Sequence, residues 1–264
     1  MKILSWNCNC KFREKYHLLN KFDADILVIQ ECEDPQQSSN SNYRSWAKNY
    51  LWVGNKKHQG LGIFAKSNIK LEKLGFPVSN YNLFLPALIN NTYPLIGVWT
   101  KNATSIKKSY INQLWNFLLE NKKLINFSQI IIAGDWNSNS QSDRKRSEGN
   151  HTDVVKLLKK ERVYSAYHKL RKLEHGFETE PTFYLYRNIE KPYHFDYIFV
   201  HEGWLTEKSL LSICEPATWL KYSDHIPLLF ESKFNFNKKK IFTLKLKIGL
   251  PYVCVSLMRS NRFC

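Results

Sequence analysis

The sequence predicts an α/β fold, a four-layer α/β/β/α sandwich in which two mixed, mainly antiparallel sheets pack face to face with helices outside. Short apolar segments typical of strands recur in both halves of the 264-residue chain, and segments with helical periodicity separate them. Length alone allows one large domain or two. One domain over residues 1–233 is the simpler interpretation, because no Gly/Ser- or Pro-rich linker divides that range.

The segment QIIIAGDWNSNS at 129–140 carries the strongest strand signal. Its apolar run at 130–133 is typical of a strand covered on both faces. Gly134 ends the run, and Asp135 and Asn137 follow at the end of the strand where open α/β sheets place their ligand sites. Asp and Asn are also ordinary turn residues, so this segment alone indicates no more than a turn.

Four other segments repeat this pattern, and turn chemistry does not explain the recurrence. They are KILSW at 2–6 followed by Asn7, DILVI at 25–29 followed by Gln30 and Glu31, HFDYIFV at 194–200 with Asp196, and SDH at 223–225 directly before IPLLF at 226–230. Carboxylates, amides and one histidine therefore gather at the margins of several apolar strands.

Further elements are predicted between these segments. Strands at 61–66, 69–74, 81–89 and 93–99 are expected to form an antiparallel meander, and strands at 182–186, 195–200, 210–214 and 226–230 another sheet. Amphipathic helices are expected over 12–22, 106–118 and 154–158, the first of them in a βαβ-like beginning. Residues 36–42 are expected to form a polar surface loop.

The chain is strongly basic, with a formal net charge of +16 at pH 7. The extension at 234–264 carries seven basic residues and no acidic residue, and removing seven from sixteen leaves +9 on the rest. A basic surface favours polyanions such as nucleic acid or an anionic membrane surface. The 14% aromatic content places the chain among globular proteins, and no role is assigned to the extension.

The cysteine spacing and the apolar tracts limit which metal sites, membrane segments and cellular compartments are expected. No CxxC spacing is present, so a structural zinc site is not expected. The chain opens directly into a strand, without a basic and apolar leader, and the late apolar tract at 248–258 is too short to span a bilayer. A cytoplasmic monomer with reduced thiols and no membrane span is therefore expected.

Five motifs in one order resemble a known family. WNCN at 6–9, QE at 30–31, GDWN at 134–137, FDYIF at 195–199 and SDH at 223–225 resemble the endonuclease/exonuclease/phosphatase superfamily of metal-dependent phosphoesterases, best its bacterial nuclease-like branch. The resemblance spans residue 1 to about residue 231 and implies Mg²⁺-dependent hydrolysis of phosphodiesters, with Mn²⁺ as a possible substitute. An endo- or exonuclease is expected, with DNA favoured over RNA. A phosphatase or phosphodiesterase acting on a nucleotide, sugar phosphate or lipid headgroup, and a non-catalytic nucleic-acid binder, are the alternatives.

The resemblance also implies a role for each motif residue. Glu31 is implied as the chief metal ligand, with Asn7 and Asp224 nearby. An acid at the end of an apolar strand is costly unless it is paired or bound to a metal, which agrees with that assignment. An exposed loop glutamate is the structural alternative.

Four residues are implied in catalysis. Asp135 resembles the residue that orients or deprotonates the attacking water, and Asn137 the residue that fixes it and donates to the phosphate. His225 resembles the histidine that faces the phosphate, with Asp196 as its carboxylate partner. A carboxylate beside a histidine favours the imidazolium, which donates a hydrogen bond to a phosphoryl oxygen.

Further substrate contacts are less direct. Asn7 is also expected to contact the substrate. Trp99 stands where relatives carry His or Tyr and offers only one N–H donor, so a core position is an equal alternative. Asn102 aligns with an amide that contacts phosphate in the apurinic-site nuclease branch.

The remaining histidines and basic segments receive weaker assignments. Surface or capping roles are expected for His151, His168 and His175, and a position close to the site for His194. The loop at 54–60 and the basic run at 144–146 are expected either to hold a nucleic-acid backbone or to form solvated surface.

Overall fold

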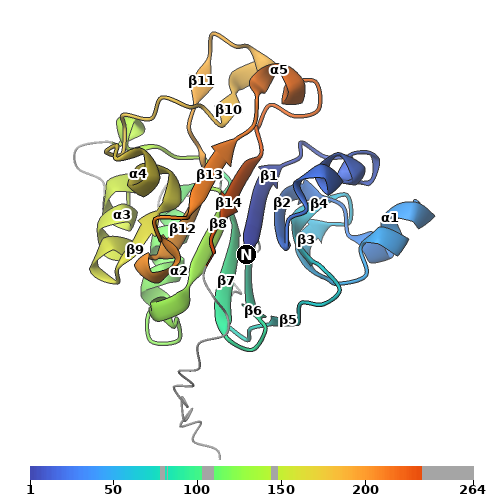
Figure 1. Cartoon of the computed structure of the whole chain (residues 1–264), viewed down its shortest axis with the longest axis horizontal. Helices are drawn as coiled ribbons and strands as arrows, with labels where there is room; N and C mark the ends of the chain where they lie inside the picture. Colours follow the sequence, from blue (N-terminus) through green and yellow to red (C-terminus); the bar gives the residue numbers. More distant parts are fainter. Residues whose placement is uncertain (78–80, 82, 103–109, 144–147, 234–264) are drawn as a thin grey trace, which may run out of the picture. The chain divides into compact units, whose positions relative to one another are not determined.

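Two six-stranded sheets form the centre of the computed structural model, which describes residues 1–77, 81, 83–102, 110–143 and 148–233 (Figure 1). The β1 sheet contains, in spatial order, β13 (Leu210–Ile213), β14 (Leu228–Glu231), β1 (Lys2–Asn7), β2 (Ile26–Cys32), β4 (Gln59–Ala65) and β3 (Tyr50–Lys56). The β8 sheet contains β5 (Leu71–Lys73), β6 (Phe84–Ile89), β7 (Tyr93–Trp99), β8 (Ile131–Asp135), β12 (Asp196–His201) and β9 (Val163–Ser165). The pairs β1–β2 and β7–β8 are parallel and the others antiparallel, which confirms the predicted fold class.

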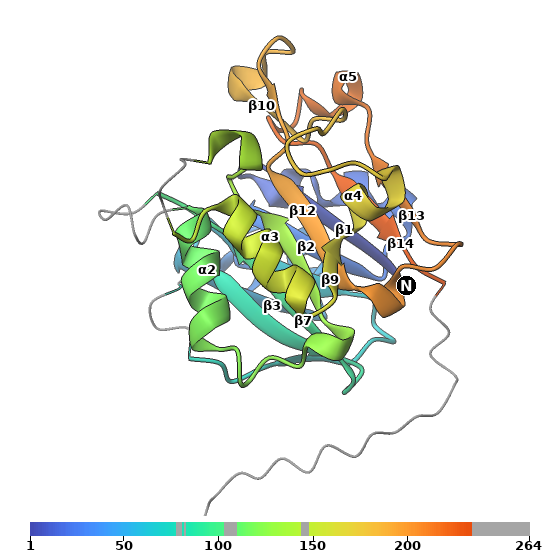
Figure 2. The ribbon, with the colours of Figure 1, turned by 90° about the vertical axis from the view of Figure 1, so that its left-hand side faces the viewer.

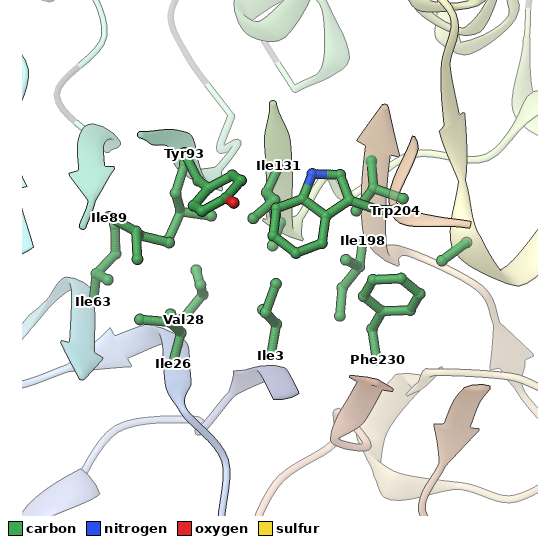
Figure 3. Packing of buried hydrophobic residues seen from close by; sticks show 14 of the residues in the cluster. Ile3, Ile26, Val28, Ile63, Ile89, Tyr93, Ile131, Ile198, Trp204 and Phe230 are labelled. Carbon is green, nitrogen blue, oxygen red and sulfur yellow. The ribbon is translucent and has the colours of Figure 1, made fainter. Parts of the chain in front are cut away.

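The main hydrophobic core lies between the two sheets (Figure 3). Side chains alternate across a strand, so Ile26 and Val28 of β2 enter this layer, whereas Leu27 and Ile29 enter the core on the outer face. Ile131 of β8 and Ile198 of β12 face them from the other sheet. Each fully buried aliphatic side chain stabilises the fold by roughly 1.5–3 kcal/mol.

Two helices, α2 (Ile111–Glu120) and α3 (His151–Lys160), cover the outer face of the β8 sheet (Figure 2). Leu114, Phe117 and Leu118 of α2 recur at helical spacing and pack in the same cluster as residues of β8 and β12. α2 and α3 confirm the helices predicted over 106–118 and 154–158. Residues 106–109 of the former prediction lie outside the described residues.

The outer face of the β1 sheet carries mainly short turns of helix. The predicted amphipathic α-helix at 12–22 is wrong: 3₁₀ helices occupy Phe12–Glu14 and Tyr16–Phe22, and Lys11 before them has a left-handed backbone. The aromatic side chains of this segment instead pack in a cluster around Phe12 and Tyr16. That cluster also receives α1 (Ser41–Trp46), so the predicted polar loop is partly helical as well.

Strand membership corrects two further predictions. β14 pairs with β1, and β13 pairs with β14, so neither joins β12. Residues 182–186 contribute only β10 (Phe183–Tyr184), which pairs with β11 (Pro192–Tyr193). The strand predicted at 61–66 is β4, which belongs to the β1 sheet, so the meander contains only β5, β6 and β7. Local periodicity does not encode which distant strands pair, because pairing depends on long-range contacts.

The remaining elements are α4 (Ala166–Arg171), α5 (Pro216–Trp219) and the β3–β4 hairpin. The hairpin absorbs most of the loop predicted at 54–60, leaving a turn at 57–58. Within the described residues, no helix combines the length and apolarity that a bilayer span requires. The basic run at 144–146 and the extension at 234–264 lie outside the described residues.

Candidate active site

The predicted site residues converge where strands of both sheets end. Asn7 is the last residue of β1, and Asp135 is the last residue of β8. Asp196, the first residue of β12, pairs directly with Asp135 across the antiparallel register. Parallel pairing of β1 with β2 places Asn7 opposite Gln30, and Glu31 therefore follows at the same end.

Glu31 occupies a break in the regular strand. Its backbone is left-handed, with φ 60°, and the β2–β4 register shifts between Gln30 and Cys32. A bulge of this kind changes the direction of a side chain within a strand. At this position it directs the Glu31 carboxylate to the site, where Oε1 accepts a hydrogen bond from Asn7 Nδ2 at 3.2 Å.

Asn7 joins two carboxylates. Its Nδ2 donates to Glu31 Oε1 at 3.2 Å and to Asp135 Oδ2 at 3.1 Å, while its Oδ1 accepts from the backbone N–H of Asn9 at 3.0 Å. One amide group thus bridges residues 31 and 135, which lie on different sheets. Because an amide binds metal through oxygen, Asn7 becomes a ligand only after a 180° turn of this group.

Two further groups hold the second oxygen of Glu31. Gln59 Nε2 donates to Oε2 at 3.0 Å, and the Cys10 thiol donates to the same atom at 3.5 Å. Burial, together with the Glu31 charge, raises the pKa of Cys10 to about 11, so the thiol keeps its proton at neutral pH. No sequence pattern indicated either contact. Gln59 lies in the β3–β4 hairpin, and only the pairing of strands brings it to Glu31.

Gly134 allows β8 to approach β7 directly before Asp135. Its φ is +147°, and a Cβ added there would lie 1.8 Å from the Val98 carbonyl oxygen. Any larger residue would force the two strands apart. The glycine in the GDWN motif is therefore required by backbone packing.

Asp135 is buried, and hydrogen bonds fix both of its oxygens. Oδ1 accepts from the Asn137 backbone N–H at 2.9 Å, and Oδ2 accepts from Asn137 Nδ2 at 2.8 Å. The Asn137 amide also donates to the Thr100 carbonyl at 3.0 Å. Burial raises the pKa of Asp135 to about 7, although the nearby His225 charge lowers it. A pKa of about 7 is suited to a general base at neutral pH.

His225 lies between two acids. Its Nδ1 is 2.9 Å from Asp196 Oδ2, and its Nε2 is 3.9 Å from Asp135 Oδ2. Burial alone would lower the pKa of His225, but the Asp196 and Asp135 carboxylates raise it to about 10. The ring is therefore a buried imidazolium at neutral pH, with Nε2–H available for a further acceptor.

Asp196 is positioned by Thr182, whose Oγ1 accepts from the Asp196 backbone N–H at 3.0 Å. Among the described residues, Asp196 Oδ1 is buried without a hydrogen-bond partner. Phe183 packs its ring 4.6 Å from the His225 ring. Thr182 and Phe183 thus support the pair formed by Asp196 and His225, a role that no sequence pattern indicated.

Asp224 lies at the more exposed margin of the site. Its Oδ1 accepts from Asn9 Nδ2 at 2.9 Å, and Ser223 Oγ donates to the Asn7 backbone carbonyl at 2.7 Å. Direct hydrogen bonds therefore join the SDH motif at 223–225 to the WNCN motif at 6–9. Asn9 and Ser223 stand inside the motifs, but no sequence pattern indicates these contacts.

Trp99 and Asn102 line a pocket of about 320 Å³. Trp99 is 2% exposed and pairs with Asp135 in the β7–β8 register, whereas Asn102 is exposed. Lys101 Nζ lies 4.2 Å from the Trp99 ring centroid. The other residues that line the pocket include Lys56, Tyr81, Leu83 and Gln59, the last of which also contacts Glu31.

The donor set fits a hard divalent cation. Glu31 and Asp135 converge on one amide, and Asp135, Asp196 and His225 offer ligand atoms within 4.8 Å of one another. Oxygen-rich sites with one or two carboxylates suit Mg²⁺, which retains several waters. Because His225 is held as an imidazolium, its nitrogen is less suited to metal than the neighbouring oxygens.

A second group of titratable side chains, the histidine cluster, consists of His151, His168, His175, His194 and Glu178. The surface or capping roles predicted for the first two are wrong, since His151 is fully buried and His168 is 6% exposed. His194 joins this cluster and not the active site, because its ring packs on Tyr167 with centroids 4.6 Å apart. No paired spacing in the sequence indicates the cluster.

Comparison with known proteins identifies a family for most of the chain. The family model described as "Endonuclease/Exonuclease/phosphatase family" matches residues 4–225, which contain every predicted site residue. No curated protein sequence matches the chain significantly.

Solved structures with this fold come from several organisms. An AP endonuclease from Archaeoglobus fulgidus is 20% identical, with a TM-score of 0.66 over 88% of this chain and 99% of that one. A 3′-5′ exonuclease from Neisseria meningitidis is 18% identical, with a TM-score of 0.64 over 88% and 99%. A 3′ phosphatase from Neisseria, bound to a product DNA hairpin, is 18% identical, with a TM-score of 0.66 over the same shares. At these identities the likeness shows a shared fold.

Proposed function

Because the chain belongs to the endonuclease/exonuclease/phosphatase family, we propose that this phosphoester hydrolase is a Mg²⁺-dependent endo- or exonuclease that cleaves nucleic acid, with DNA favoured over RNA. One observation carries the proposal. Asp135 and the His225 imidazolium face each other with 3.9 Å between Oδ2 and Nε2, too far for a direct hydrogen bond. A phosphate and an attacking water fit the chemistry of these two groups.

Asp135, His225 and Asn137 have separate proposed roles in hydrolysis. Asp135, whose pKa lies near 7, orients the attacking water and accepts its proton. His225 donates its Nε2 proton in a hydrogen bond to a non-bridging oxygen, and Asp196 holds the ring for that contact. Asn137 fixes Asp135 through two hydrogen bonds. Its amide also donates to the Thr100 carbonyl, so the predicted contact with the phosphate requires it to exchange one of these acceptors.

Glu31 is the proposed chief metal ligand, with Asn7 and Asp224 nearby. Bound Mg²⁺ supplies electrostatic stabilisation of the charge that develops on the phosphoryl and leaving-group oxygens, and Mn²⁺ is a plausible substitute because it accepts the same ligands. Gln59 and Cys10 hold the Glu31 carboxylate in place.

A polymeric substrate is favoured by the surroundings of the site. Lys56 and Lys101 line the pocket beside Gln59, together with Trp99 and the exposed Asn102. Cations that follow a phosphate backbone are typical of nucleic-acid grooves. Trp99, which is 2% exposed, supports Lys101 without stacking on a base. The charge of +16 adds a long-range attraction for polyanions.

The test is a cleavage panel with purified full-length protein. Plasmid, single- and double-stranded DNA oligonucleotides, RNA, and 3′-phosphorylated or small phosphoesters are incubated with Mg²⁺, Mn²⁺ or EDTA. We expect metal-dependent cleavage of DNA by the wild-type protein and by Glu72→Gln, a surface control, and loss of cleavage in Glu31→Gln.

Other outcomes separate the alternatives. Release of phosphate from small esters without cleavage of polymers would favour the phosphatase or phosphodiesterase function at the same site. Nucleic-acid binding without metal-dependent cleavage of any ester would refute the enzymatic proposal.

A further inference from the structure

We propose that the histidine cluster is a separate structural metal site, which binds Zn²⁺ through His168, His175 and Glu178. Cysteine spacing predicts no structural zinc, but histidine and carboxylate side chains also bind this ion. The folded chain instead brings together three side chains from α4 and the segment that follows it, and each offers a ligand atom within 4.8 Å of the others.

The separations are close to those of a tetrahedral site. His168 Nε2 lies 2.9 Å from Glu178 Oε1, and His151 Nε2 lies 3.4 Å from His175 Nδ1. Ligands at about 2.0–2.1 Å from a tetrahedral zinc lie roughly 3.4 Å from one another. His151 adjoins His175 but is not among the residues whose ligand atoms all lie within 4.8 Å of one another, so a water would complete the tetrahedral set.

One ring must move for the site to close. The His168 and His175 rings stack with centroids 3.6 Å apart and an angle of 16° between their planes. Two nearly parallel rings cannot both aim their nitrogens at one ion, so His175 must tilt out of the stack. His175 lies outside regular secondary structure, which makes that tilt a local change.

The surroundings hold the ligands as metal sites usually do. Ser165 Oγ is 2.8 Å from His168 Nδ1, which leaves Nε2 of the same ring directed at Glu178. The Gly176 backbone N–H donates to both oxygens of Glu178 at 3.1 Å. Hydrogen bonds to the far side of a ligand fix its orientation and are regularly found around bound metals.

A purely hydrogen-bonded cluster leaves polar groups unsatisfied. Within the described residues, His151 Nδ1 and His194 Nε2 are buried without a hydrogen-bond partner. A neutral imidazole has one donor and one acceptor nitrogen, and buried polar atoms are nearly always paired. A zinc ion would take up the lone pairs of His168, His175 and Glu178 at the centre of the cluster. It would leave His194 as it is, because His194 Nδ1 donates to the Glu180 carbonyl. Imidazole with carboxylate is also a donor set that favours Zn²⁺ over Mg²⁺.

The ion would stabilise the segment that supports the active site. The Tyr167 hydroxyl accepts from the backbone N–H groups of Thr179 and Glu180, at 3.1 and 3.2 Å. Two residues further on, Thr182 holds the Asp196 backbone. Zinc would therefore join α4 to the segment that positions Asp196, without contacting substrate.

The experiment measures zinc in the metal-stripped full chain. Zn²⁺ and Co²⁺ are titrated into wild type, His175→Asn, Glu178→Gln, the double variant Glu31→Gln/His225→Gln, and His58→Gln as an exposed-histidine control. We expect one tightly bound Zn²⁺ and a tetrahedral Co²⁺ spectrum in wild type, the double variant and the control. Affinity should fall by more than about 100-fold in His175→Asn and Glu178→Gln, because each change removes a ligand, and loss of a residue that only supports a ligand already costs on the order of 10–100-fold.

The outcomes exclude one another. Equal zinc affinity in wild type and in folded His175→Asn would overturn the site, as would loss of the zinc in the double variant, which would assign it to the active site. If His175→Asn and Glu178→Gln do not fold, the Co²⁺ spectrum of the double variant decides, and absence of a tetrahedral signal rejects the proposal.

Discussion

Asp135 and Asp196 are direct neighbours across β8 and β12, and their carboxylates approach opposite nitrogens of the His225 ring. The distances are 2.9 Å from Nδ1 to Asp196 and 3.9 Å from Nε2 to Asp135. The shorter contact makes Asp196 the partner that fixes the ring. The longer one leaves Nε2–H free to serve a substrate oxygen.

Replacing His225 by Gln removes this imidazolium. We expect kcat for phosphodiester cleavage to fall about 10²–10⁴-fold, the usual contribution of a positioned acid–base group. Initial rates at saturating Mg²⁺ measure it, with near-UV circular dichroism as the folding check. His17→Gln, at an exposed position, is the matched control. Wild-type turnover in folded His225→Gln would remove His225 from the mechanism.

Replacing Glu31 by Gln keeps the shape but removes the charge at the proposed metal site. We expect the Mg²⁺ concentration for half-maximal activity to rise about 10–100-fold or more, since a metal-bound carboxylate contributes most of the local attraction. Activity is measured against Mg²⁺ concentration, with Glu72→Gln as an exposed control. An unchanged Mg²⁺ dependence would place the metal elsewhere.

Lys56 and Lys101 should contribute to the salt dependence of nucleic-acid binding. Each phosphate contact that is lost lowers the magnitude of the slope of log K against log salt by roughly 0.7–0.9. The Lys56→Ala/Lys101→Ala variant should therefore show a shallower slope in fluorescence anisotropy titrations. Lys208→Ala, at an exposed position outside the pocket, should leave the slope unchanged. Identical slopes for all three proteins would mean that the pocket does not contact the backbone.

The metal-free protein should lose stability as the pH falls below about 6.5, the usual pKa of an unfolded histidine. Burial lowers the pKa of His151 to about 3, of His175 to about 2 and of His194 to about 4. Depressed folded-state pKa values mean that the unfolded chain binds these protons first, so their stabilising contribution is complete above pH 6.5 and declines below it.

Each of these histidines should cost about 1 kcal/mol of unfolding free energy between about pH 7 and pH 5.5. Urea unfolding in EDTA at both pH values measures the loss. Two groups act in the opposite direction. Burial raises the pKa of Asp135 to about 7, so the folded chain binds this proton first and offsets roughly one histidine over the same window. The pKa of His225 is raised to about 10, so its contribution declines only as the pH rises from 6.5 toward that value. Stability that is flat across the acidic window would show that the three rings are not buried neutral groups.

Gly134→Ala should destabilise the fold by at least about 2 kcal/mol, because its Cβ would meet the Val98 carbonyl oxygen at 1.8 Å and its φ of +147° strains any L-residue. Gly75→Ala is the control, since nothing lies within 4 Å of its added Cβ. We expect the control to change the unfolding free energy by less than about 0.5 kcal/mol in urea titrations. Similar values for both variants would contradict the close β7–β8 approach.

The sequence identified most of the residues that meet at the site, because strand ends with polar side chains leave a local signature. Asn7, Glu31, Asp135, Asp196 and His225 stand beside apolar runs, and the structure brings them together. Their individual roles remain predictions.

The missed residues depend on contacts that no local pattern contains. Gln59 reaches Glu31 only through the β2–β4 register and its bulge. The histidine cluster assembles side chains from α3, α4 and two later segments, so no spacing reveals it. Sheet membership fails for the same reason: β14 joins β1 through pairing of Lys2 with Glu231, at opposite ends of the described chain.

The proposed site is divided between the two sheets. Asn7 and Glu31 belong to the β1 sheet, and Asp135 and Asp196 to the β8 sheet, so the thickness of the apolar layer in Figure 3 sets the gap between the two halves. Trimming Ile3 or Ile198 within that layer would let the halves drift relative to each other, although neither side chain touches a reacting atom. The kcat of such variants would then report sub-ångström changes in the distance between the two sheets, which a melting curve does not resolve.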